Sequence, residues 1–130
     1  MIRIKGKIVR GWGRASIAIA IQKKLFAQSI PTIGRCFNGT INMIAEENPI
    51  PLFKSHIMFL NLKWKPNRWE TFILYPVRVI IGRQSKRGWI YRPFGSSHFR
   101  EKNYIEVISP KFNIGNHRIL TLEIFEQPHE

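Results

Sequence analysis

Three short stretches of the chain carry residue types that could bind or transfer a phosphate group. The first is Gly11-Trp12-Gly13-Arg14-Ala15-Ser16, where a glycine pair lies between an expected strand and an expected helix. Such a turn lets backbone N–H groups approach phosphate oxygens, and the helix start adds partial positive charge. Arg14 and Ser16 would add side-chain contacts. The alternative is a tight strand-to-helix turn without a ligand, and the stretch does not match the Walker pattern.

The second stretch, Phe37-Asn38-Gly39-Thr40-Ile41-Asn42, could hold a metal ion. Thr40 and Asn42 are two positions apart, so in a strand their side chains would face the same way. Two neutral oxygens on one face could bind Mg²⁺ whose remaining ligands are phosphates and water. The alternative is an Asn-Gly turn that enters a strand.

The third stretch places Ser96, Ser97 and His98 in a loop before the apolar segment 104–109, which contains Glu106. A carboxylate among apolar residues is costly unless it is paired. Glu106 could accept a hydrogen bond from a ligand hydroxyl or ring nitrogen. The alternative is an ion pair with one of the many arginines.

Composition limits the chemistry that the chain can perform. Its 130 residues fit a single domain over 1–130, and its eight acids are all Glu. Without Asp there is no Ser-His-Asp triad, and a single cysteine excludes an intrachain disulfide or a cysteine zinc cluster. The net charge of +13 favours an anionic partner, such as a nucleotide, a nucleic acid or an anionic membrane surface. No apolar run approaches the ~20 residues needed to span a bilayer, so we expect a cytoplasmic protein.

The elements that must position these residues are mostly strands. Alternation predicts a strand near the N-terminus. Later strands are expected at the end of 32–44 and at 57–64, 70–81, 89–91, 104–109 and 119–125. The spacing of Ile17, Ile21, Leu25 and Phe26 predicts one helix over 16–29, capped by Ser16 and ended by Pro31. Pro76 indicates a bulge or an edge position in its strand. Six or seven short strands predict an all-β fold, either a small barrel or a sandwich.

Several motifs follow one another in a recognisable order. They are Gly6-Lys7-Ile8-Val9-Arg10-Gly11-Trp12-Gly13, Gly39-Thr40-Ile41-Asn42, Tyr75-Pro76-Val77-Arg78-Val79-Ile80-Ile81-Gly82, Arg92-Pro93, Ser97-His98 and Ile105-Glu106-Val107-Ile108-Ser109-Pro110. In this order the chain resembles the archaeal-type CTP-dependent riboflavin kinases over nearly its whole length. The resemblance implies a small six-stranded cradle-loop β-barrel with one short helix.

The resemblance also implies roles for particular residues. Thr40 and Asn42 would ligate Mg²⁺, and Glu106 would contact the flavin together with Ser97, or with Ser96 because the loop looks one residue longer. The nucleotide would be bound by Gly11, Trp12, Gly13, Arg14, Ala15, Ser16, Lys111, Phe112, Asn113 and Ile114. Ala15 replaces the second glycine of the family's loop, and the segment after Pro110 is shorter than the family's.

These roles lead to a specific expectation about function. The protein would be a monomer that transfers the γ-phosphoryl group of CTP to the 5′-hydroxyl of riboflavin, giving FMN and CDP. Phosphoryl transfer depends on positioning and charge neutralisation, which Mg²⁺ and the basic residues would supply. Glu106 is the candidate catalytic residue, as a general base or as a contact to the ligand hydroxyl. Two alternatives stay open: a basic nucleic-acid-binding barrel domain, and a flavin or nucleotide binder without catalysis.

Overall fold

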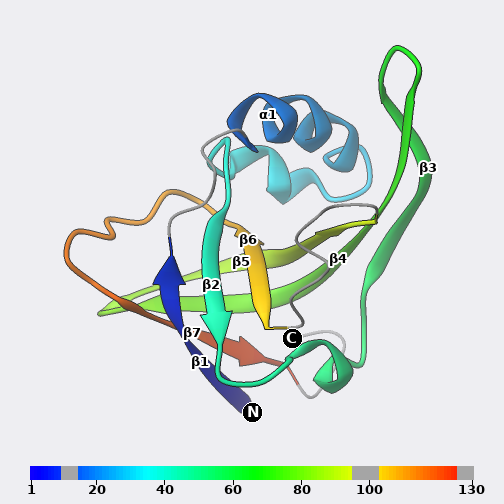
Figure 1. Ribbon diagram of the computed structural model, residues 1–130. Coiled ribbons are helices and arrows are strands. Elements are labelled where there is room, and N and C mark those ends of the chain that lie inside the picture. Colours follow the sequence, from blue (N-terminus) through cyan, green and yellow to red (C-terminus); the bar gives the residue numbers. More distant parts are fainter. Residues whose placement is uncertain (10–14, 95–102, 126–130) are drawn as a thin grey trace.

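The computed structural model describes residues 1–9, 15–94 and 103–125 of the chain (Figure 1). Within these ranges the protein forms seven strands, one α-helix and two 3₁₀ helices. In chain order they are β1 (Ile2–Val9), α1 (Ala15–Phe26), η1 (Pro31–Arg35), β2 (Ile41–Ala45), η2 (Ile50–Leu52), β3 (Ile57–Lys65), β4 (Arg68–Ile81), β5 (Gln84–Pro93), β6 (Tyr104–Ile108) and β7 (Ile119–Ile124).

The strands form one antiparallel sheet that closes on itself. Its order is β3-β4-β5-β6-β2-β1-β7, and β4 also pairs with β7. The closed ring therefore contains six strands, and β3 is a seventh that pairs with the first half of β4. The all-β barrel predicted from the sequence is confirmed, with β3 added outside the ring.

The long strand β4 changes partner along one of its edges. Residues 68–74 pair with β3, whereas residues 78–80 pair with β7. Pro76 lies between these two ladders, so the missing N–H of proline interrupts neither of them. Pro76 is thus unpaired on this edge of β4, whereas on the other edge it lies opposite Trp89 of β5 in a regular ladder without a bulge.

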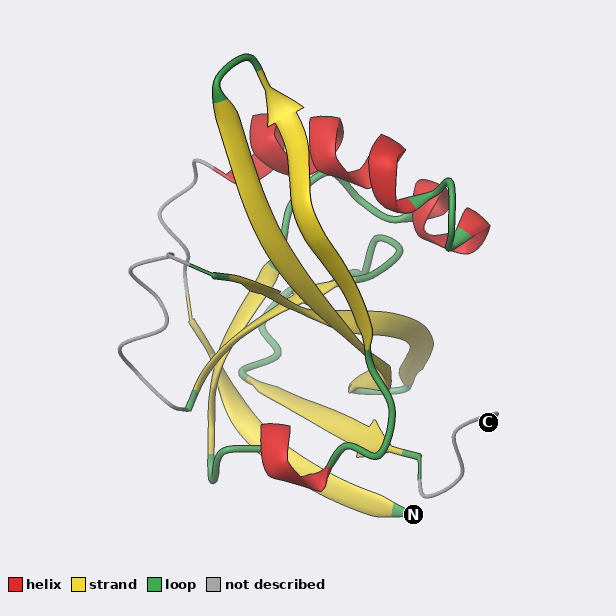
Figure 2. Cartoon of the chain, turned by 90° about the vertical axis from the view of Figure 1, so that its right-hand side faces the viewer, coloured by secondary structure: helices red, strands yellow, loops and turns green. Residues whose placement is uncertain are grey.

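Two apolar layers hold the fold together. The first fills the barrel, and all six ring strands contribute to it; its members include Ile4, Met43, Val77, Ile90, Val107 and Leu122. The second lies outside the barrel, where α1 and η1 cover one side of the sheet (Figure 2). At its centre the fully buried Phe26 ring packs 4.8 Å from that of Phe59 and 5.2 Å from that of Phe72. The helix is thus fixed to the outer surface of β3 and β4.

The helix differs from its predicted form in bounds and in orientation. It begins at Ala15 and ends at Phe26, so Ser16 lies inside its first turn rather than at its cap, and Pro31 starts η1 instead. Its buried side carries Ile19, Gln22 and Phe26, whereas Ile17 is 72% exposed. Isoleucine and alanine alternate through the first turns, so apolar spacing alone does not select the packed side.

The turn between β4 and β5 is shorter than predicted. Residues 82–88 lie between the predicted strands at 70–81 and 89–91, but β5 already begins at Gln84. Gly82 has φ 59°, a conformation that glycine adopts without strain, so two residues suffice to reverse the chain.

Among the described residues, no helix has the length and apolar character needed to cross a bilayer.

Candidate active site

Thr40 and Asn42 lie side by side at the start of β2. Thr40 immediately precedes the strand and Asn42 is its second residue. The Thr40 hydroxyl donates a hydrogen bond of 2.8 Å to Asn42 Oδ1. The two side chains therefore share one face of the sheet, as their spacing predicts.

Glu106 lies directly across from this pair. In the register of β2 and β6, Asn42 is opposite Glu106, and directly opposed residues project to the same face. Glu106 is only 9% exposed. Burial raises the pKa of its carboxyl from 4.5 to about 7. A contacting guanidinium would lower this pKa instead, so the shift argues against the structural ion pair that the sequence left open.

The face that carries Glu106 continues beneath α1 as a small polar cluster. The Tyr91 hydroxyl donates a hydrogen bond of 2.6 Å to Gln22 Oε1, and both residues are buried. Burial raises the pKa of Tyr91, and the negative charge of Glu106 raises it further. Gln22 and Tyr91 were not among the sequence candidates. Gln22 is followed directly by Lys23 and Lys24, so no pattern in the sequence distinguished it from the exposed polar residues of the helix.

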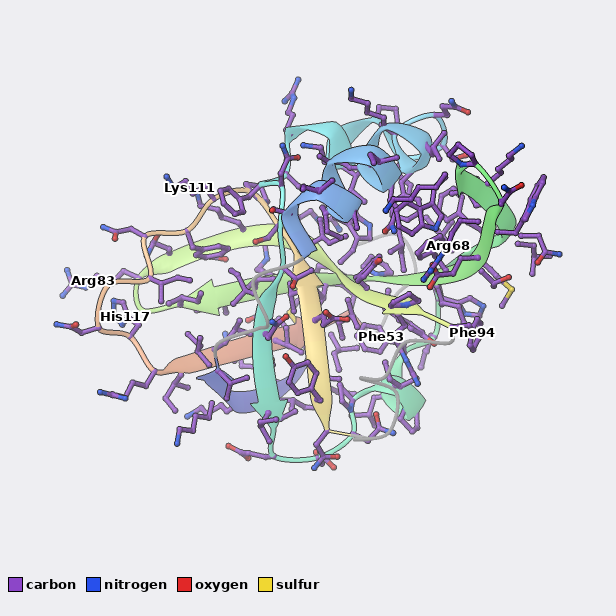
Figure 3. The ribbon with its side chains drawn as sticks, turned by 45° about the horizontal axis from the view of Figure 1, so that its top comes forward. Phe53, Arg68, Arg83, Phe94, Lys111 and His117 are labelled. Carbon is purple, nitrogen blue, oxygen red and sulfur yellow. The ribbon has the colours of Figure 1, made fainter. Side chains whose placement is uncertain are left out.

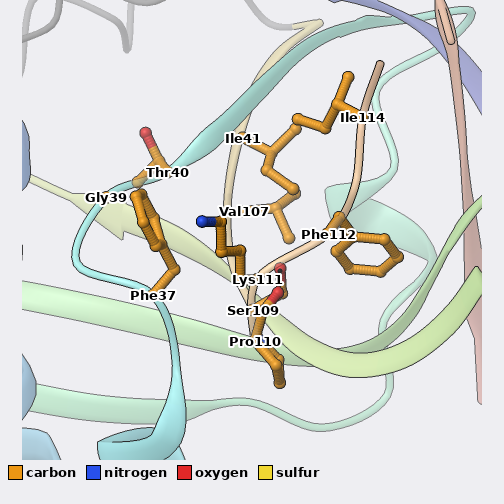
Figure 4. A pocket seen from close by; sticks show the side chains of 10 residues that line it. All are labelled: Phe37, Gly39, Thr40, Ile41, Val107, Ser109, Pro110, Lys111, Phe112 and Ile114. Atoms are coloured by element: carbon orange, nitrogen blue, oxygen red, sulfur yellow. Dashed lines mark hydrogen bonds between the residues drawn. The ribbon is translucent and has the colours of Figure 1, made fainter.

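A pocket of about 170 Å³ opens next to Thr40. Ile41 and Val107 line it, so the pocket lies on the other face of β2 and β6 from Asn42 and Glu106. One wall comes from the segment leading into β2, and the other from the end of β6 and the segment after it (Figure 4). In Figure 4 the Lys111 side chain extends across the pocket toward Gly39, and the Thr40 hydroxyl points away from Phe112. The lining residues are Phe37, Gly39, Thr40, Ile41, Val107, Ser109, Pro110, Lys111, Phe112 and Ile114.

Hydrogen bonds hold the segment that forms the second wall at both of its ends. The Phe37 N–H donates to the Ser109 carbonyl at 2.9 Å, which joins the two walls. Gln84 makes two hydrogen bonds with the Asn113 backbone, donating to its carbonyl at 2.7 Å and accepting from its N–H at 2.8 Å. The Lys86 amine donates to the Lys111 carbonyl at 2.9 Å. The start of β5 therefore sets the position of the predicted nucleotide segment.

The oxygens of Thr40 and Asn42 fit the geometry of a magnesium site. Two ligands at right angles, each about 2.1 Å from Mg²⁺, lie about 3.0 Å apart. The separation of 2.8 Å between Thr40 Oγ1 and Asn42 Oδ1 is close to this value. The described part of the chain contains no cluster of three or more His, Cys, Asp or Glu side chains. A metal on this pair would therefore depend on ligand phosphates for its charge balance.

The side of the barrel that carries the pocket also exposes several basic residues. Lys111 and Arg83 are exposed, and Figure 3 places both on the same side of the barrel as His117. Arg118 is also exposed in this segment. Their positive charge would raise the local concentration of an anionic ligand.

The structure brings together part of the predicted site. Thr40, Asn42 and Glu106 share one face, and Lys111, Phe112 and Ile114 line the adjacent pocket, whereas Asn113 is held by Gln84. Ala15 is the first residue of α1, and Ser16 follows it at an exposed position. The remaining predicted residues lie outside the described ranges: Gly11, Trp12, Gly13, Arg14, Ser96 and Ser97.

No protein-family model matches the chain, and no curated protein matches its sequence significantly. The candidate site is therefore defined by its residue motifs and by the strand pairing that brings them together. Two motifs far apart in the chain, at residues 39–42 and 105–110, meet through the pairing of β2 and β6.

Proposed function

We propose that the protein is a riboflavin kinase that transfers the γ-phosphoryl group of CTP to the 5′-hydroxyl of riboflavin. The observation that carries the proposal is the convergence of three features. An oxygen pair suited to Mg²⁺ and a buried carboxyl share one face of β2 and β6, and Thr40 of that pair also lines the pocket that contains a lysine. A phosphoryl transferase needs this combination to neutralise phosphate charge and to orient a hydroxyl.

Thr40 and Asn42 would hold Mg²⁺ through their side-chain oxygens. When bound, the ion supplies charge neutralisation at the phosphates of the nucleotide. Lys111 adds a positive charge from the opposite wall. Ile41, Val107 and Phe112 give the pocket an apolar surface that excludes water. A dry surrounding strengthens the attraction between these charges and the phosphates.

Glu106 is the proposed partner of the riboflavin hydroxyl. In the reaction the hydroxyl oxygen bonds to the γ-phosphorus, the bond from that phosphorus to CDP breaks, and the hydroxyl proton is released. With a pKa of about 7, Glu106 is partly ionised at neutral pH and can accept this proton. The same carboxyl can instead orient the hydroxyl by a hydrogen bond, and both roles remain part of the proposal.

The decisive experiment is a search for FMN. The protein is incubated with riboflavin, Mg²⁺ and each nucleoside triphosphate in turn, and the flavins are separated by chromatography. We expect FMN with CTP and none without Mg²⁺. Absence of FMN with every nucleotide would refute the kinase, and riboflavin binding without turnover would favour the non-catalytic binder.

A matched pair of variants tests the metal assignment. Thr40→Val keeps the size of the side chain and removes its oxygen, whereas Thr40→Ser keeps the oxygen. We expect Thr40→Val and Asn42→Ala to lower turnover at least about 100-fold, because such shared sites supply several kcal/mol of charge stabilisation. Thr40→Ser should retain most of the activity. Equal activity of the Val and Ser variants would show that the Thr40 oxygen binds no metal.

A further inference from the structure

A β-hairpin projects from the barrel beside α1. It consists of β3 and the first half of β4, and both Figure 1 and Figure 2 show its tip extending beyond the ring. Its inner face is anchored, because Phe59, Leu62 and Trp64 pack against the apolar layer that α1 covers. The hairpin is therefore a fixed feature of the surface.

The outer face of the hairpin exposes large side chains that the fold does not use. Leu60 is 70% exposed, Trp69 is 62% exposed and Met58 is 44% exposed. Folding gains little from residues in such positions, and a group of them on one element indicates contact with a partner. Trp69 is the most informative of the three, because a tryptophan ring offers a broad surface for stacking.

Positive charge lies beside both tryptophan rings of the hairpin, Trp69 on the outer face and Trp64 on the inner face. Lys63 Nζ lies 5.3 Å from the centre of the Trp69 ring. Lys65 Nζ and the Arg68 guanidinium lie 4.9 Å and 5.6 Å from the centre of the Trp64 ring. All three basic residues are exposed.

The acid in the same part of the hairpin is already engaged. Glu70 accepts a hydrogen bond of 3.2 Å from the Trp64 indole N–H and lies 3.8 Å from Arg68. One carboxylate faces three cations, so the hairpin keeps a net positive charge.

We propose that the exposed end of this hairpin, called the hairpin face and made of Lys63 and Trp69 on the outer side with Lys65 and Arg68 at the tip, binds single-stranded nucleic acid. Phosphates would contact the three cations, and an unpaired base would stack on the part of the Trp69 ring that Lys63 leaves open. Basic grooves with exposed aromatic rings bind single strands in this way, largely without sequence preference. The proposal is independent of the kinase and gives a role to charge that a small-molecule site does not need.

The distribution of residues along the hairpin disfavours an anionic membrane as the partner. A hairpin that enters a bilayer carries its apolar side chains at the tip. Here the tip is Lys65-Pro66-Asn67-Arg68, which is exposed throughout and charged at both ends, and Leu60 lies farther down the strand. A duplex is disfavoured because its bases are paired and cannot stack on Trp69.

The test measures binding of the full chain to a labelled oligothymidylate of about 20 nucleotides by fluorescence anisotropy. We expect Trp69→Ala to weaken binding about 10-fold and Trp69→Phe, which keeps a ring, to recover most of it. The double variant Lys63→Gln/Lys65→Gln should reduce the slope of log affinity against log salt by about 1.4, or about 0.7 per lost phosphate contact. A control variant, Lys5→Gln/Lys7→Gln, removes the same charge from exposed positions on β1 and should stay within about 2-fold of the unmodified protein.

Several results would overturn the proposal. One is that Trp69→Ala binds the oligonucleotide with unchanged affinity. Another is that Lys5→Gln/Lys7→Gln loses as much affinity as Lys63→Gln/Lys65→Gln. A third is that a duplex of the same length binds as tightly as the single strand. Binding to phosphatidylserine vesicles that is lost in Trp69→Ala, without binding to the oligonucleotide, would assign the face to a membrane instead. If Trp69→Ala does not fold, the salt slope of the double lysine variant decides.

Discussion

Burial sets the acidity of Glu106, and this has a measurable effect on stability. The carboxyl ionises near 4.5 in the unfolded chain and near 7 in the folded protein. Its contribution to stability is therefore complete below pH 4.5 and is lost as the pH rises through 7. Glu106→Gln cannot ionise and does not lose this contribution. We therefore expect the melting temperature of Glu106→Gln minus that of the unmodified protein to increase between pH 4.5 and 7 and to stay constant above this range. Thermal melts in metal-free buffer test this, and a constant difference at every pH would contradict it.

Burial also raises the pKa of Cys36, and the consequence there is a loss of reactivity. The residue is 5% exposed, and burial raises the pKa of its thiol from 9.0 to about 11. Only the thiolate attacks disulfide reagents, so at mildly alkaline pH the folded protein should react at least about 100-fold more slowly than the urea-unfolded chain. Following the reaction with an aromatic disulfide reagent by absorbance measures both rates. Similar rates would mean that the segment around η1 opens readily.

At this scale the sequence predicted local relations better than distant ones. The two-residue spacing of Thr40 and Asn42 was enough to place their oxygens together, because strand geometry is local. The position of Glu106 opposite Asn42 depends on the register between β2 and β6, which no local pattern specifies. For the same reason, the hydrogen bond between Tyr91 and Gln22 could not be predicted.

Among the elements, the segment after β6 is held at Asn113 by one side chain of β5. Gln84 bonds both the N–H and the carbonyl of Asn113. In Gln84→Ala the Asn113 amide loses its acceptor, so its hydrogen exchange should accelerate at least about 10-fold. Gln84→Glu keeps an acceptor oxygen and should retain the protection of this amide. Exchange measured by NMR distinguishes the two variants, and equal rates in both would show that the segment is held by other contacts.

The contact between β1 and β2 depends on a glycine. A Cβ atom at Gly6 would lie 2.2 Å from Met43 Cε and 2.6 Å from the Ile44 carbonyl oxygen. The methionine can move, but the backbone oxygen belongs to the neighbouring strand. Gly6→Ala should therefore lower the free energy of unfolding by about 2 kcal/mol in urea denaturation. Gly34→Ala is the matched control, because its Cβ would meet only Ala27 Cβ at 3.8 Å, and it should change stability little.

Element boundaries followed the strength of each local signal. The bounds of β3, β4, β6 and β7 lie close to the predictions, because β-branched and aromatic runs end there at turn residues. The prediction for β5 missed its first half, where the residues are basic and polar. Cross-strand pairing with β4 along 78–81 extends the strand through these residues, which propensity alone would leave in a turn.

On the scale of the whole molecule, the surface is more basic than composition suggests. Glu106 and Glu123 are buried, and Glu123 is paired with Arg3 at 2.6 Å. Among the described residues, Glu46 and Glu47 are the exposed acids. The positive charge of the chain therefore lies mainly in the solvent, where it acts on partners rather than on folding.

The pocket and the hairpin face lie on opposite sides of the barrel, so their proposed activities should be separable. Figure 3 places Lys111 on one side and Arg68 on the other. Lys111→Gln should raise the KM for CTP about 10-fold, since one charged phosphate contact is lost, and leave oligonucleotide affinity within about 2-fold. Lys63→Gln/Lys65→Gln should do the reverse, weakening the oligonucleotide and leaving FMN formation unchanged. Parallel losses in both assays would instead indicate one continuous anionic site, with the net charge of +13 acting as a single field.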